Sequence, residues 1–369
     1  MPAPPPDSEF PVLVRALADA DWTAAPGVAP EAVAAALPAL RGHGVLAGIA
    51  RRLERTALWP RLDDATRRAL AEAASAGVAR ELASRAALDG ALAALARAGI
   101  AVLVVKGEAL ARDVYPLPGV RERGDVDAWV AADDFVGAER VLAGCGFARR
   151  PAASGEWLQP EATWMRDDAQ GRVAIDLHRR LFAQPSLAAV LPFDDVLARS
   201  LPFGDSARMP GRADALLVAA LHRVAHHADE ERALWWWDVH LLCTRDPDAA
   251  SAAAAIARAR GASAILGDAF AHTAATFGTR FPPGFVAGLL ACAPREPSAR
   301  LLRPMSASAR WWYDLRTLPD ARARRRWIAE TLFPSRAYMR ARFGDAPLAW
   351  LYAKRAARGA WRAVFPPRK

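Results

Sequence analysis

The chain has 369 residues, 53% of them hydrophobic and 24% charged, and this balance allows a well-packed core. No run of 18 uncharged apolar residues is present, so we expect no transmembrane segment, and the start MPAPPPDSEF lacks the basic and apolar regions of a signal peptide. The three cysteines are scattered without metal-ligand spacing. We therefore expect a reduced, cytoplasmic protein with neither disulfides nor structural zinc.

The first part of the chain is expected to be helical. Alanine, leucine and arginine dominate residues 10–98, and residues 63–99 carry apolar side chains three and four positions apart, which is a helical spacing. Pro60 separates this segment from the helix before it, and Gly99 fits its C-terminal end. We take residues 1–98 as an N-terminal helical region.

Strand and helix patterns then alternate. Short β-branched runs predict strands, and amphipathic spacing predicts helices. The predicted strands are IAVLVV (100–105), GDVDAWVA (124–131) and the two arms of residues 156–181 around a turn at DDAQGR (167–172); the predicted helices are GEALARDVY (107–115) and DDFVGAERVLAGCG (133–146). This order predicts a small α/β domain, which we place at residues 99–208.

From residue 212 onward the pattern is helical again, and we expect a helical domain at residues 209–320. The last segment, residues 321–369, holds 13 Lys or Arg and two acids, a net charge of +11 in a chain whose total is +9. Its arginines and aromatic residues suit a nucleic-acid-binding surface, a helix on an anionic membrane or acidic protein, or packed helices with a solvated arginine face. The sequence leaves these three interpretations open.

Three aspartates are the candidate catalytic residues. Asp125 and Asp127 are two positions apart in a predicted strand, so their side chains share one face. Asp176 lies in the apolar strand VAIDLH, where an unpartnered carboxylate is costly to bury. If the two strands pair, the three carboxylates converge, and oxygen ligands of this kind hold Mg²⁺. We expect two Mg²⁺ ions, with Mn²⁺ as the alternative, and Asp176 suits the acceptance of a proton from an attacking hydroxyl.

The residues around these aspartates suit phosphate binding. Gly107 lets the backbone approach a phosphate closely, and the helix after it presents free N–H groups to an anion. Lys106 adds a positive charge, and Arg121 and Arg123 flank the acidic pair. The expected nucleotide-binding residues are Lys106, Gly107, Arg121, Arg123, Gly124 and His178.

Three features of the later helices have structural interpretations. His222 and His226 share a helix face, but Arg223 stands where a zinc-protease helix carries its general-base glutamate, so we favour core or nucleotide-cleft contacts over a metal site. The tryptophans at 235–237 point in different directions on a helix and are expected in the core or at a domain interface. Asp238 is expected to pair with a His or Arg of the preceding helix.

The stretch VVKGEALARDVYPLPGVRERGDVDAWV (104–130) resembles the signature of the DNA polymerase beta-like nucleotidyltransferase superfamily. More narrowly, it is similar to the bacterial family of uncharacterised nucleotidyltransferases, with its Lys-Gly-x-x-Leu turn, its Tyr-Pro and its Arg-x-x-Gly-Asp-x-Asp strand. The segments at 173–181, 216–242 and 332–344 resemble later blocks of that family, so the likeness extends over roughly residues 30–360.

The resemblance implies an α+β fold, in which a polymerase beta-like α/β core with a mixed sheet is flanked by N- and C-terminal helical regions. It also implies that Asp125, Asp127 and Asp176 are metal-binding catalytic carboxylates and that Gly107 is the glycine of the phosphate turn. One residue departs from the pattern. The wider superfamily usually has Gly or Ser after the turn glycine, whereas this chain has Glu108. An inward Glu108 would repel phosphate, and an outward one is favoured at a helix start.

These features lead to a functional hypothesis of Mg²⁺-dependent transfer of a nucleoside monophosphate from an NTP, such as ATP, to an acceptor hydroxyl. The acceptor is left open among a protein side chain, an RNA end, a small molecule and a sugar. The alternative is a catalytically silent binding or regulatory protein on the same fold, and Glu108 is the feature that supports it.

Overall fold

The computed structural model describes residues 9–19, 23–150, 155, 157, 159–168, 171–226 and 230–364. The proline-rich start before residue 9 and the centre of the predicted turn at residues 167–172 lie outside these ranges.

The predicted N-terminal helical region is observed over its described residues. Its helices are α1 (Phe10–Ala16), α2 (Pro30–Gly42), α3 (Leu46–Leu53), the short 3₁₀ helix η1 (Trp59–Arg61) and α4 (Asp64–Arg97). Asp63 caps the start of α4, since its carboxylate accepts a hydrogen bond from the backbone N–H of Thr66 at 2.9 Å. Gly99 follows the end of α4 with a φ of 74°, which only glycine adopts at low cost, so the predicted helix end is confirmed.

A seven-stranded mixed sheet in the order β3-β4-β5-β2-β1-β7-β6 forms the centre of the protein. The strands are β1 (Val102–Val105), β2 (Val126–Val130), β3 (Ala148–Arg149), β4 (Glu161–Asp168), β5 (Gly171–His178), β6 (Leu201–Phe203) and β7 (Ala207–Met209). β1 runs antiparallel to β2, and β2 runs parallel to β5. The four longer strands are those that the sequence predicts. The other three have two or three residues each, too few to show a periodic pattern.

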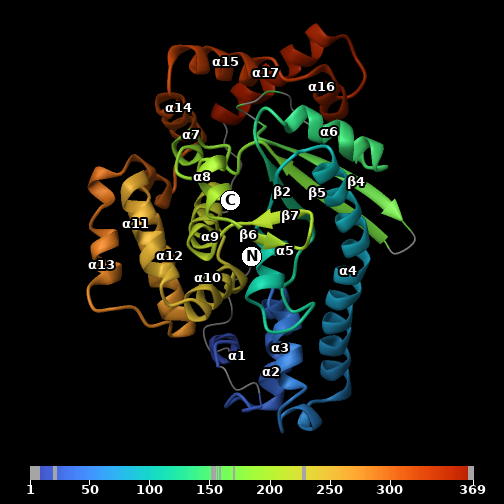
Figure 1. Ribbon diagram of the computed structural model, residues 1–369, viewed down its shortest axis with the longest axis vertical. Helices are drawn as coiled ribbons and strands as arrows, with labels where there is room; N and C mark the ends of the chain where they lie inside the picture. Colours follow the sequence, from blue (N-terminus) through green and yellow to red (C-terminus); the bar gives the residue numbers. More distant parts are fainter. Residues whose placement is uncertain are drawn as a thin grey trace.

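Side-chain alternation divides the two faces of this sheet. Val102 and Val104 of β1 pack in one cluster with residues of α4 and of α6 (Phe135–Gly144), whereas Leu103 and Val105 join the cluster that contains the N-terminal and later helices. Figure 1 shows α4 running along one side of the sheet, with the later helices gathered on the other side. Whether a polar side chain in these strands lies on one face of the sheet or the other therefore depends on its odd or even position along the strand.

The remaining described elements are helical. They are α5 (Lys106–Asp113), α7 (Pro185–Ala188), α8 (Phe193–Ala198), α9 (Arg212–His226), α10 (Ala233–Arg245), α11 (Ala249–Arg260), α12 (Ser263–Phe277), α13 (Phe285–Leu290), η2 (Ala293–Arg295), η3 (Pro297–Leu302), α14 (Ala307–Thr317), α15 (Ala321–Leu332), α16 (Arg336–Phe343) and α17 (Leu348–Val364). Helices α14–α17 lie together at one end of the molecule (Figure 1). The fold is α+β, as predicted, with helices flanking the sheet. Among the described residues, no helix combines the length and apolarity needed to cross a membrane.

Candidate active site

Two aspartates lie side by side on neighbouring parallel strands. Asp127 of β2 and Asp176 of β5 are Cα partners in the register. Their strand neighbours Val126 and Ile175 pack toward α4 and α6, so both carboxylates emerge on the opposite face, and Asp125 directly precedes β2. The predicted pairing of the two strands is therefore confirmed. The catalytic role of the three aspartates stays a prediction.

Asp127 is buried and bonded to two basic side chains. Its Oδ1 atom accepts a hydrogen bond from Lys106 Nζ at 2.6 Å and lies 2.9 Å from His178 Nε2. Burial would raise the pKa of Asp127, but Lys106 and His178 outweigh that effect and hold the pKa below its usual value. Burial would likewise lower the pKa of Lys106, yet Asp127 and the neighbouring carboxylates raise it. Asp127 and Lys106 thus form a charged pair.

Asp125 and Asp176 carry negative charge that is less well compensated. Asp125 keeps contact with solvent, but partial loss of hydration, followed by repulsion from Asp127 and Asp176, raises its pKa to about 6. Asp176 is half-buried, and its Oδ1 atom is buried with no hydrogen-bond partner among the described residues. Because carboxylate oxygens that are crowded and unsatisfied suit a hard cation, the donor chemistry fits Mg²⁺. The described residues do not, however, contain a ready-made group of three His, Cys, Asp or Glu metal ligands.

A cavity of about 420 Å³ opens beside the aspartates. One part of its lining is charged and includes Lys106, Arg121, Arg123, Asp125, Asp127, Glu161 and Asp176. Another part is less polar and includes Leu110, Met209, Val218, His222, His226 and Trp235. A volume of this size falls in the usual range for small-molecule and cofactor sites. The cavity therefore joins the acidic strand ends to the faces of α9 and α10.

Arg121 is held by Asp238 of α10. Its Nε and Nη2 atoms donate to the two carboxylate oxygens of Asp238 at 3.0 and 2.8 Å, and Tyr115 Oη donates to the same carboxylate at 2.7 Å. The expectation that Asp238 pairs with the preceding helix is therefore wrong: its partners come from the segment between α5 and β2. Gly107 lies against this pair, since a Cβ there would be 2.6 Å from Arg121 Nη1. The glycine makes room for the buried guanidinium.

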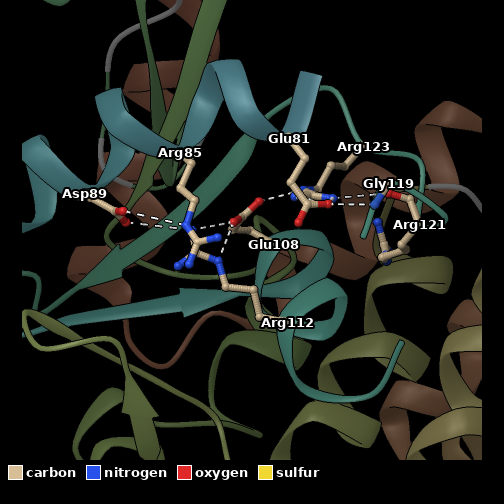
Figure 2. A network of polar contacts seen from close by, with 8 residues as sticks. All are labelled: Glu81, Arg85, Asp89, Glu108, Arg112, Gly119, Arg121 and Arg123. Atoms are coloured by element: carbon tan, nitrogen blue, oxygen red, sulfur yellow. Dashed lines mark hydrogen bonds and ion pairs between the residues drawn. The ribbon is translucent and has the colours of Figure 1, made fainter. Parts of the chain in front are cut away.

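Glu108 does not line this cavity, and its carboxylate lies in a network of ion pairs, which Figure 2 shows. Its carboxylate, only 2% exposed, contacts Arg123 Nε at 2.5 Å and Arg112 Nη2 at 2.8 Å. Arg123 also contacts Glu81 of α4, and Glu81 accepts a hydrogen bond from the backbone N–H of Gly119. The charge of Glu108 is thus compensated inside the protein. Glu108 therefore adds no unpaired acid to the cavity, and this removes the support that it gave to a catalytically silent protein.

The other predicted nucleotide-binding residues occupy different positions. Arg123 lines the cavity, but its guanidinium is engaged by Glu108 and Glu81. Gly124 is exposed just before Asp125, and open space surrounds the position of a Cβ there. His178 is fully buried, and its Nε2 atom lies 2.9 Å from Asp127 Oδ1, so the imidazole helps to hold that carboxylate in position. Their nucleotide-binding roles stay predictions.

Glu161 is a residue that the sequence reasoning missed. It pairs in register with His178, and its Oε2 lies 3.3 Å from His178 Nδ1 while its side chain lines the cavity. His178 therefore lies between Asp127 and Glu161. The only local signal for this role is the position of Glu161 at the start of a strand that pairs with VAIDLH. The three tryptophans 235–237 are buried, as predicted, and Trp235 also reaches the cavity.

A sequence model of the family described as "Uncharacterised nucleotidyltransferase" matches residues 30–278. The match contains the Lys106–Gly107 turn, both aspartate strands and the cavity helices α9 and α10, but it ends before the likeness expected at residues 332–344. Comparisons with curated proteins and with solved structures give no significant match. Since the match spans more than half of the chain and includes the site, the chain belongs to the family of uncharacterised nucleotidyltransferases.

Proposed function

We propose that the protein transfers a nucleoside monophosphate from an NTP to an acceptor hydroxyl in a Mg²⁺-dependent reaction. The observation that carries the proposal is the juxtaposition of Asp127 and Asp176 on paired strands, beside Asp125 and at the wall of a nucleotide-sized cavity. Membership of a nucleotidyltransferase family supports the same chemistry. The proposal also assigns the protein to the polymerase beta-like superfamily and to the cytoplasm of a bacterium.

Asp125, Asp127 and Asp176 would hold the metal, as two Mg²⁺ ions or with Mn²⁺ in their place. A bound divalent ion supplies neutralisation of the phosphate and carboxylate charges. The unsatisfied Oδ1 of Asp176 supports this assignment because it is an available oxygen ligand. The repulsion from Asp127 and Asp176 that helps to raise the pKa of Asp125 also supports it, because a bound cation would relieve that repulsion. Lys106 would bind phosphate oxygens after leaving Asp127, its partner at 2.6 Å, whereas Arg121 and Arg123 are held by the more deeply buried Asp238 and Glu108.

The proposed transfer step is an in-line displacement at the α-phosphorus of the NTP. The acceptor oxygen forms a bond to the α-phosphorus of the NTP, the bond from that phosphorus to the bridging oxygen breaks, and pyrophosphate leaves with the bond electrons. The acceptor proton passes to the carboxylate of Asp176. The acceptor is a hydroxyl of a protein, an RNA or a small molecule. The basic C-terminal helices are a further candidate surface for nucleic acid or an acidic partner.

Thermal unfolding with Mg²⁺ and each of the four NTPs in turn tests nucleotide binding. An NTP at about 100 times its dissociation constant stabilises the folded state by about 2.7 kcal/mol. Incubation of the protein with the same NTPs, labelled at the α-phosphate, and a cell extract then identifies the labelled acceptor. The proposal expects a shift with at least one NTP and Mg²⁺-dependent labelling. A protein that no NTP stabilises and that labels nothing would instead be the silent binding or regulatory protein.

A further inference from the structure

Lys106 has an unusual backbone conformation for its residue type. Its φ of 54° is the only positive φ at a non-glycine residue in the described part of the chain. Left-handed backbone is disfavoured for residues with a Cβ, and such strain persists only where the surrounding structure enforces it. Lys106 begins α5 directly after Val105, and Val105 is the register partner of Asp127. The strained turn therefore lies across from the carboxylate that the Lys106 side chain contacts.

The Lys106 side chain is a partly buried counter-ion of Asp127. It is 14% exposed, and its Nζ lies 2.6 Å from Asp127 Oδ1. The carboxylates of Asp125, Asp176 and Glu161 line the same cavity. Without a metal, the ammonium group compensates the charge of Asp127 and lowers the repulsion among these acids.

A divalent cation bound to the Asp127 carboxylate, through either oxygen, would lie within a few ångströms of Lys106 Nζ, because that nitrogen already contacts Oδ1. Two positive charges within a few ångströms of each other repel strongly in a partly buried site. The lysine side chain is flexible and carries a compact charge, so it can leave Asp127 if another anion is within reach. Because Lys106 lines the cavity, the triphosphate of a bound NTP is the anion that its ammonium group would meet.

We propose that Lys106 is the resident counter-ion of Asp127 and that it exchanges Asp127 for the triphosphate when metal and nucleotide bind. This inference rests on the proposed nucleotidyl transfer. It adds that the binding of the metal and the binding of the nucleotide are coupled. Metal binding alone must displace the lysine with no new partner for it, whereas nucleotide supplies that partner. Each ligand therefore strengthens the binding of the other, and the coupling is reciprocal.

The test measures Mn²⁺ binding to the whole chain by electron paramagnetic resonance, without and with a non-hydrolysable analogue of the NTP that gives the largest thermal shift. Lys106→Met removes the charge, Lys106→Gly removes both the charge and the backbone strain, and Lys106→Arg keeps a charge. The chain offers a matched control in Lys354→Met, because Lys354 is exposed on α17. Circular dichroism confirms that each variant is folded.

For the wild-type protein and for Lys354→Met, we expect the analogue to tighten Mn²⁺ binding by about tenfold or more. Lys106→Met and Lys106→Gly are expected to bind Mn²⁺ about tenfold more tightly than wild type when no analogue is present, and to lose most of the coupling, while Lys106→Arg keeps the weak metal binding. Equal Mn²⁺ affinities of wild type and Lys106→Met, or weaker binding by the variant, would overturn the counter-ion role and leave nucleotidyl transfer standing. Absence of Mn²⁺ binding in every variant, with and without analogue, would overturn both.

Discussion

Arg121 and Asp238 are 117 positions apart and form a two-point ion pair, with Nε–Oδ1 and Nη2–Oδ2 distances of 3.0 and 2.8 Å. The side chains are 9% and 4% exposed. Burial alone would lower the pKa of Arg121, but Asp238 raises it, so the guanidinium stays charged. The pair ties α10 to the segment that leads into Asp125, and it fixes the helical wall of the cavity relative to the acidic strand ends.

Asp238→Ala is expected to lower the free energy of unfolding by about 3–5 kcal/mol, because it leaves the buried Arg121 without a counter-ion. Urea unfolding followed by circular dichroism measures this loss. Asp167→Ala is the control, since Asp167 and Arg172 form a pair whose side chains are 71% and 64% exposed, and an exposed pair contributes at most about 1 kcal/mol. Equal losses in the two variants would contradict the structural role of the Arg121–Asp238 pair.

Gly107→Ala is expected to destabilise the protein by about 1–3 kcal/mol, because the new Cβ would lie 2.6 Å from Arg121 Nη1 in a packed site. It should also weaken the thermal shift by NTP, since the turn faces the cavity. Gly124→Ala is the matched control in the same segment, where a Cβ meets open space. A Gly107→Ala protein that is as stable as Gly124→Ala would show that the turn tolerates a side chain.

Glu108→Ala is expected to lower the free energy of unfolding by about 3 kcal/mol, because Arg123 loses its closest buried counter-ion. If Glu108 instead opposed phosphate binding, its removal would tighten the binding of NTP. We expect no tightening in an NTP titration of Glu108→Gln, the variant of the same shape. Glu139→Ala serves as the stability control, because its partner Arg149 is 48% exposed.

Asp314 of α14 gives a pH-dependent prediction away from the site. Burial raises its pKa from 3.8 to about 6, although Arg310 opposes the rise. The folded state therefore holds the proton more tightly than the unfolded state, and this group costs stability as the pH rises from about 4 to 6, with the full cost present above 6. Because the pKa rises from 3.8 to about 6, Asp314→Asn should nearly match wild type near pH 4 and exceed its stability by about 3 kcal/mol at pH 7. Urea unfolding at both pH values checks this, and a constant difference between the proteins would contradict it.

The strands that carry the aspartates could be predicted from the sequence. A run such as VAIDLH is too apolar to be a surface loop, and the alternation of side chains fixes which face Asp176 and Asp127 share. The long α4 and its end at Gly99 could be predicted in the same way, because periodicity marks a helix and a left-handed glycine marks its end.

The pairing of charges could not be predicted in the same way. Arg121 and Arg123 flank the aspartates in the chain, which suggested phosphate ligands, yet their partners are Asp238 and Glu108. Which acid an arginine meets depends on how helices pack, and no local pattern encodes that. The pairing of Glu161 with His178 has the same origin, since it depends on a register between two strands.

The central claim is that the aspartates of β2 and β5 act together in nucleotidyl transfer, and the rate of Mg²⁺-dependent pyrophosphate release from NTP tests it most directly. The rate is compared among wild type, Asp127→Asn, Asp176→Asn and Asp133→Asn, where Asp133 is an exposed aspartate just after β2. We predict that the first two variants lose at least about a thousandfold in rate while remaining folded and that Asp133→Asn keeps the wild-type rate. A rate that survives both Asp127→Asn and Asp176→Asn would contradict the claim.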